Sequence, residues 1–128
     1  MVKHSYSLQN IHLNNSWLTI GTFDGVHLGH QAILSSLRAG AQASNAPAVV
    51  LTFHPQPAVF LGKRQNPSSL TTPEERAVLM GDLGIDLVIT YPFNQQTATT
   101  PAQSFIELLK EQLGFSWLGM GEDFALGK

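Results

Sequence analysis

Short apolar runs alternate with amphipathic stretches along most of the chain. The first run is SWLTI (16–20), and the second, APAVVLTF (46–53), is continuous and rich in β-branched residues. Runs of the second kind are typical of strands buried on both faces of a parallel sheet. Two further strand candidates are DLVITY (86–91) and FSWLGMG (115–121). The pattern predicts four strands and leaves residues 1–15 polar and irregular.

Helical patterns lie between these strands. Over residues 29–43, apolar side chains recur at spacings of three and four. A second helix is predicted within TTPEERAVLMGDLG (71–84), which carries both start and stop signals. Its N-cap, first residue, capping-box partner and terminator are, in that order, Thr72, Pro73, Glu75 and Gly84. Residues 54–69 contain three prolines and predict a long loop.

The same signals return in TTPAQSFIELLKEQLG (99–114) and predict a third helix. Here the N-cap, first residue, capping-box partner and terminator are Thr100, Pro101, Gln103 and Gly114. Strands that alternate with helices predict an α/β fold, a Rossmann-like, doubly wound parallel sheet. About four strands are present. Because such a sheet rarely stops directly after a strand, we expect the sequence to be cut short.

Composition limits the classes of function. The chain has 128 residues, the length of one domain, a net charge of −2 and a pI of about 6.2. It has no basic field that would bind nucleic acid or an anionic membrane by charge alone. The absence of cysteine excludes disulfides, thiolate catalysis and Cys-ligated zinc, and is compatible with a cytoplasmic location. Neither a signal peptide nor an apolar run of membrane-spanning length is apparent.

The stretch GTFDGVHLGH (21–30) is the strongest candidate for chemistry. It follows a predicted strand and opens a predicted helix, the place where open α/β sheets bind ligands. Gly21 and Gly25 permit tight turns, and Gly29 would let a ligand approach the backbone. The free N–H groups of the helix start attract anions. His27 and His30 lie one helical turn apart and can donate hydrogen bonds to phosphate oxygens.

Two other interpretations of this stretch remain open. The two histidines could hold a metal ion with Asp24 as third ligand. They could also cap the helix without any function. No further cluster of metal ligands accompanies them in the sequence, so the pattern as a whole favours a polyphosphate site.

In these residues the chain resembles the HxGH nucleotidyltransferase superfamily. Two further stretches narrow the resemblance to bacterial FAD synthetases. LTFHPQPAVFL (51–61) is similar to their F-x-P-x-P segment. The stretch starting VITYPFNQ at residue 88 and the closing GEDFALGK (121–128) are similar to their phenylalanine-rich strand end and G-x-D-F-x-F-G segment.

The resemblance implies an FMN adenylyltransferase, which makes FAD and pyrophosphate from ATP and FMN. His27 and His30 would contact the ATP phosphates and stabilise the transition state. Mg²⁺ would arrive with the ATP. The ATP loop would be formed by Gly21, Thr22, Phe23, Asp24, Gly25 and Gly29, with Asp24 orienting it.

The flavin side of the site is implied by the same resemblance. Phe53, Pro55 and Pro57 would form a rigid wall around FMN, and Asp123 and Phe124 would face it. A loop that merely packs is the alternative for the proline segment. The chain departs from the family pattern at His54, Ala125 and Leu126.

By the same comparison, residues 1–128 form an FMN adenylyltransferase domain that is incomplete at its C-terminus. The family's S-S-T-x-[IV]-R-type motif, its fifth strand and a riboflavin kinase domain would lie beyond residue 128. Strand 115–121 would pair with strand 16–20 and form an edge, so we expect the isolated chain to self-associate and make little FAD. Another nucleotidyltransferase and a non-catalytic nucleotide-binding module are the alternatives.

Overall fold

The computed structural model describes residues 2–21, 23, 28–54 and 72–120, without the side chains of residues 28–30 and 120. Five parallel strands form one sheet in the order β1-β4-β3-β2-β5. The strands are β1 (Lys3–Ser5), β2 (Ser16–Ile20), β3 (Ala48–His54), β4 (Leu87–Pro92) and β5 (Phe115–Met120). The helices are α1 (Leu28–Ala43), α3 (Pro73–Asp82), α4 (Gln95–Thr99) and α5 (Ala102–Leu113). The predicted α/β class is confirmed.

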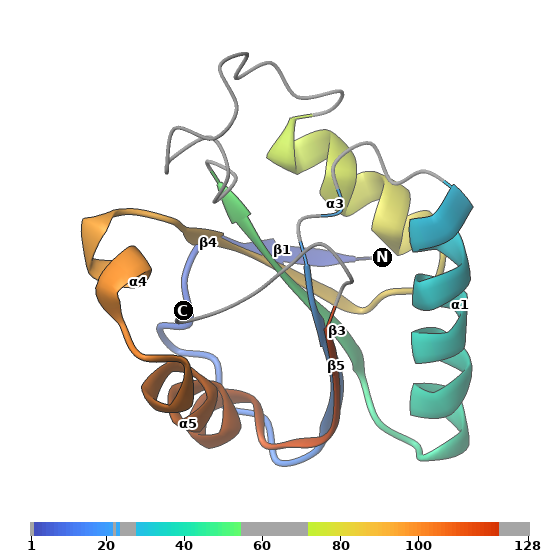
Figure 1. The fold of residues 1–128 in the computed structure, drawn as a ribbon. Coiled ribbons are helices and arrows are strands. Elements are labelled where there is room, and N and C mark those ends of the chain that lie inside the picture. The colour runs from blue at the N-terminus through green and yellow to red at the C-terminus, as the bar shows by residue number, and fades with distance from the viewer. Residues whose placement is uncertain (1, 22, 24–27, 55–71, 121–128) are drawn as a thin grey trace.

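The sheet is doubly wound. From β2 the chain passes through α1 to β3 and through α3 to β4, and both helices cover one face (Figure 1). The chain then returns through α4 and α5, on the opposite face, to β5 on the far side of β2. The predicted pairing of strand 115–121 with strand 16–20 is confirmed. The winding reverses between β2 and β5, so the topological switch point lies at the carboxyl end of β2.

The prediction of an irregular N-terminus was wrong, because residues Lys3–Ser5 form a fifth strand that pairs with β4. This strand has only three residues, and at the sheet edge it needs no apolar run. After it, Leu8 is 6% exposed and packs in the core on the α5 side. The backbone of Leu13 also donates a hydrogen bond to Gln112 O at 2.9 Å. The polar N-terminal segment is therefore part of the packed fold.

The two faces of the sheet bury separate apolar clusters. Along β3, Val49, Leu51 and Phe53 pack on the α5 side, whereas Val50 packs on the side of α1 and α3. All four side chains are fully buried. The continuous apolar run therefore reflects a strand that is covered on both faces, as predicted from the sequence.

Local backbone signals explain where the other elements begin and end. Asp86 sets the start of the β3–β4 pair, because its N–H donates to Ala48 O at 2.9 Å while its Oδ2 accepts from Ala48 N at 2.8 Å. Gly84 (φ +97°) follows α3, and Gly114 (φ +53°) ends α5 in the left-handed region. Both predicted terminators are confirmed.

The two TTP sequences behave differently. Thr72 caps α3 in a complete capping box, because Glu75 N donates to Thr72 Oγ1 at 3.1 Å and Thr72 N donates to Glu75 Oε1 at 2.8 Å. The predicted box at the third helix was wrong: Pro101 is the N-cap residue of α5, with no side-chain cap. Thr100 instead ends the short helix α4 and donates to Gln96 O at 2.6 Å. The Gln103 side chain bonds Glu107 at 3.4 Å.

This difference makes the two threonines a matched pair for mutation. Thr72→Ala removes a cap and should lower the free energy of unfolding by about 1 kcal/mol. Thr100→Ala makes the same change in the same sequence context, directly before a proline, and should cost less than half as much. Urea unfolding of both variants measures the difference, and equal losses would contradict the assignment of the caps.

Candidate ligand site at the carboxyl edge of the sheet

The carboxyl end of β2 opens toward the first turn of α1. Gly21 N donates to Leu51 O at 3.1 Å, so the pairing with β3 continues one residue past β2. Helix α1 begins at Leu28. Its N-terminus lies at the same edge of the sheet as the carboxyl ends of β2 and β3 (Figure 1). This strand–loop–helix arrangement, at the switch point, is the one predicted from the sequence.

Gly21 and Phe23 are the described residues of the predicted ATP loop that precede α1. Phe23 adopts a positive φ of +50° and is 1% exposed, packed with Leu34 of α1 and Ala77 of α3. A Cβ atom on Gly21 would lie 2.7 Å from Cε2 of the Phe23 ring. Gly21 is therefore required for close packing rather than for a left-handed backbone, and Phe23 anchors the loop in the core.

On the predicted flavin side, Phe53 is the one described residue. Its ring is fully buried and meets Phe93 edge-on, with centroids 5.5 Å apart, and Tyr91 in the same way at 6.4 Å. His54, which ends β3, is exposed, and its carbonyl accepts a hydrogen bond from Phe93 N at 3.2 Å. Phe53 thus lies in an aromatic cluster directly beneath the carboxyl edge.

Most of the remaining predicted site residues lie outside the described part of the chain. These are Thr22, Asp24, Gly25, His27, Pro55, Pro57, Asp123 and Phe124. Gly29 and His30 fall in the first turn of α1, of which only the backbone is described. The roles of all these residues remain predictions. Among the described residues, no group of three His, Cys, Asp or Glu side chains lies close enough to hold a metal ion.

A polar cluster at the β1 edge of the sheet was missed from the sequence. His4 Nε2 lies 2.7 Å from Thr90 Oγ1, and Tyr6 donates from its hydroxyl to Glu74. Partial burial lowers the pKa of His4, an effect opposed by the charge of Glu74 and reinforced by that of Arg76. The hydrogen bond raises the pKa of Tyr6 and lowers that of Glu74. These bonds join β1 to β4 and to the first turn of α3.

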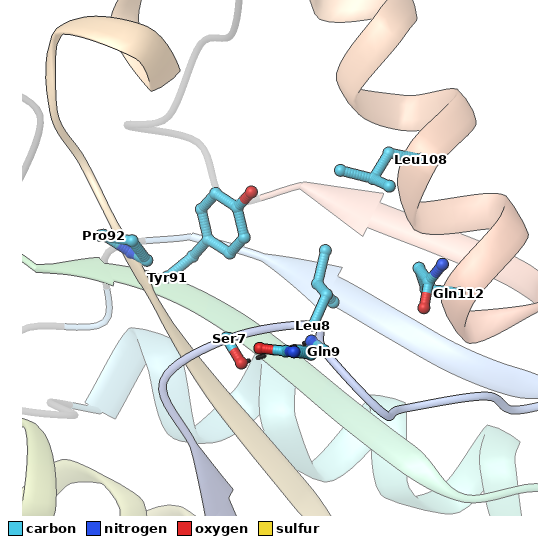
Figure 2. A pocket seen from close by; sticks show the side chains of 7 residues that line it. All are labelled: Ser7, Leu8, Gln9, Tyr91, Pro92, Leu108 and Gln112. Carbon is cyan, nitrogen blue, oxygen red and sulfur yellow. Dashed lines mark hydrogen bonds between the residues drawn. The ribbon is translucent and has the colours of Figure 1, made fainter.

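A groove of about 360 Å³ lies on the other face of the sheet, beside α5. Figure 2 shows Tyr91 of β4, Leu8 of the N-terminal segment and Leu108 of α5 around it. Its other lining residues are Ser7, Gln9, Pro92 and Gln112. The Tyr91 ring also meets the Phe105 ring edge-on, with centroids 5.4 Å apart. The groove is therefore built on the same aromatic cluster as Phe53.

Together, the doubly wound parallel sheet and the loop at its switch point define a Rossmann-like α/β protein, a class in which ligands commonly bind at the carboxyl edge of the sheet. No helix of the described residues is long and apolar enough to cross a membrane.

A family model described as FAD synthetase matches residues 9–128, and the chain belongs to this family. The chain is 34% identical over 128 residues to a bifunctional riboflavin kinase/FMN adenylyltransferase of Buchnera aphidicola, covering 99% of this chain and 41% of that protein. It is 38% identical over 111 residues to the Escherichia coli K12 protein of the same name, covering 86% of this chain and 36% of that one. The Bacillus subtilis protein of that name is 31% identical over 128 residues, covering 99% and 40%.

A solved structure supports the fold alone. It is the crystal structure of a macrolide-efflux protein from Streptococcus pneumoniae, with a TM-score of 0.82 and 24% sequence identity. The match covers 99% of this chain and 44% of that one. The chain thus spans less than half the length of the relatives it matches, in sequence and in structure.

The packing of Phe23 on Gly21 yields a test. Gly21→Ala forces the Phe23 ring to move and should lower the free energy of unfolding by about 1–3 kcal/mol. Phe23→Leu removes the ring atoms nearest to that position. In this background Gly21→Ala should therefore cost at least about 1 kcal/mol less. A double-mutant cycle by chemical denaturation measures the coupling, and additive effects would show that the two residues do not constrain each other.

Proposed function

We propose that the chain carries the FMN adenylyltransferase activity of FAD synthetases. An oxygen of the FMN phosphate attacks the α-phosphorus of ATP. The bond from that phosphorus to the bridging oxygen of the β-phosphate breaks, and pyrophosphate leaves with the electron pair. The products are FAD and pyrophosphate. Transfer of this kind depends on positioning and on stabilising negative charge, and it needs no covalent intermediate on the protein.

One observation carries this proposal: the FAD synthetase family model spans residues 9–128, and this range includes the entire loop between β2 and α1. The place of that loop supports the proposal, because ligands of doubly wound sheets bind at the switch point. The curated relatives that match the chain are bifunctional riboflavin kinase/FMN adenylyltransferases. We therefore also propose that the natural protein includes a riboflavin kinase domain.

On the ATP side, the polyphosphate would bind over the first turn of α1. The free N–H groups of this turn supply a partial positive charge, and Gly29 would leave room for the phosphates. His27 and His30 would donate hydrogen bonds to the phosphate oxygens as charge develops in the transition state. Asp24 would orient the loop. Mg²⁺ would enter as the MgATP complex, consistent with its preference for phosphate oxygens and water.

On the flavin side, Pro55 and Pro57 directly follow β3, so the wall that they are proposed to form would begin at the carboxyl edge. The buried ring of Phe53 supports this arrangement from below, since it fixes the end of β3 through Tyr91 and Phe93. Asp123 and Phe124 follow β5, which neighbours β2, and would approach the same edge. A cytoplasmic location fits an enzyme that consumes ATP.

Replacement of His30 tests the ATP side. In the natural protein that contains these residues, His30→Ala should slow FAD formation by about 10²–10³-fold, because a donor to the developing negative charge is lost. The free energy of unfolding should change little. His12→Ala is the matched control, since His12 is exposed and lies before β2.

Chromatography of FAD formed from FMN and MgATP measures the rates. Near-normal turnover in His30→Ala would remove this residue from the mechanism. If the unmodified protein adenylylates another phosphorylated acceptor in preference to FMN, the proposed adenylyl transfer stands, but FMN is not the substrate. If it binds ATP and transfers nothing, it is a nucleotide-binding module.

A further inference from the structure

The outward face of α3 carries apolar side chains in an acidic surrounding. The helix packs on the sheet through Ala77 and Met80, which are buried (Figure 1). Residues at intervals of three and four lie on one face of a helix, and five exposed side chains of α3 share such an outward face. They are Glu74, Glu75, Val78, Leu79 and Asp82. A hollow of about 420 Å³ lies on this face, and its described lining residues are the first four of these.

The apolar side chains on this surface are grouped rather than scattered. Val78 is 58% exposed, and Leu79 is 39% exposed. Tyr6, which is 50% exposed, joins the same surface, since its hydroxyl donates to Glu74, one helical turn before Val78. Among the described residues, these are three of the five large hydrophobic side chains that are exposed. Single apolar side chains on a surface are ordinary, whereas a group of them marks an interaction surface.

The α3 patch, formed by Tyr6 and the five exposed side chains of α3, is negatively charged. The hydrogen bond from Tyr6 lowers the pKa of Glu74, so this carboxylate is ionised at neutral pH. Glu75 and Asp82 add two further acidic side chains, and the one basic residue of α3, Arg76, is buried outside the patch. A partner that fits the patch therefore combines apolar side chains with lysine or arginine, whose long stems pack on apolar atoms while their charges meet the carboxylates.

The size of the α3 patch favours a partner that is tethered to the chain. A stable interface between separate proteins contains about 20–30 residues on each side, and the patch has six. A domain joined by a linker is held at an effective concentration in the millimolar range, so a smaller surface suffices. Contacts between the domains of one chain are also more polar than obligate interfaces. A second copy of the chain is disfavoured, because a symmetric contact would bring the carboxylates of two patches together.

We propose that the α3 patch is the docking surface for the riboflavin kinase domain of the natural protein, which meets it with a basic and apolar surface. The inference rests on the proposed function, which adds this domain to the chain. The occupant is of ample size, since the sequence matches cover only 41% and 36% of two bifunctional relatives. The contact places the kinase domain on the face of the sheet that α1 and α3 cover, opposite α5.

Leu79 and Leu108 form a matched pair for the test. Both are leucines on helices, one on each face of the sheet, and they are 39% and 37% exposed. Hydroxyl-radical footprinting of the natural protein, read by mass spectrometry, compares the oxidation rates of the two side chains. Without docking the rates should be equal, because the residue type and the exposure are the same. The docked kinase domain should make Leu79 react at least about fivefold more slowly than Leu108, because the core of an interface excludes water.

Charge reversal tests the chemistry of the partner. Asp82→Lys reverses one charge of the α3 patch, and no hydrogen bond joins the Asp82 side chain to the described residues. The variant should raise the oxidation rate of Leu79 by about threefold or more, and about 1 M salt should act in the same direction, because both weaken the attraction between exposed charges. Glu111→Lys is the matched control on α5, where Glu111 is likewise exposed, and it should leave Leu79 unchanged.

Equal oxidation of the two leucines would overturn the proposal. Protection of Leu79 that increases with protein concentration would also overturn it, since the occupant would then be a second copy. So would protection that neither Asp82→Lys nor salt reduces, because the partner would then not be basic. The footprinting requires no turnover. A protein that forms FAD with Leu79 exposed therefore refutes the docking alone, whereas one that protects Leu79 and transfers nothing to FMN refutes the proposed function alone.

Discussion

The site depends above all on the parallel pairing of β2 with both of its neighbours. Pairing with β3 continues through the hydrogen bond from Gly21 N to Leu51 O, and pairing with β5 fills the other side. The connection that leaves β2 leads through α1 to β3, on one side of β2. The connection from β4 leads through α4 and α5 to β5, on the other side of β2 and the opposite face of the sheet. A loop at the carboxyl end of β2 has room for a ligand, and α1 presents its N-terminus to it.

The two faces of the sheet have different compositions near this edge. Under α5 the carboxyl ends are packed by the rings of Phe53, Tyr91, Phe93 and Phe105. Under α1 and α3 they hold threonines and Arg76. The aromatic face gives the ends of β3 and β4 a rigid base, whereas the other face buries polar side chains at the same level of the sheet.

Much of this fold follows from local signals in the sequence. The buried run before His54, the capping box of Thr72 and the glycine at position 114 each predict a boundary that the structure confirms. The strand β1 was missed because three polar residues carry no periodicity, and its partner β4 lies more than 80 residues away. The capping box predicted at Thr100 was wrong because the TTP sequence does not reveal that a short helix, α4, ends at this residue. The burial of Arg76, which follows two glutamates, could not be predicted from the sequence, since it depends on tertiary packing alone.

Nucleotide binding at the carboxyl end of β2, over the start of α1, as proposed above, can be tested by amide hydrogen exchange with and without saturating MgATP. We expect slower exchange in peptides that cover residues 18–34 and no change in peptides from α5. Protection confined to the groove beside α5, or none at all in a protein saturated with ATP, would contradict it.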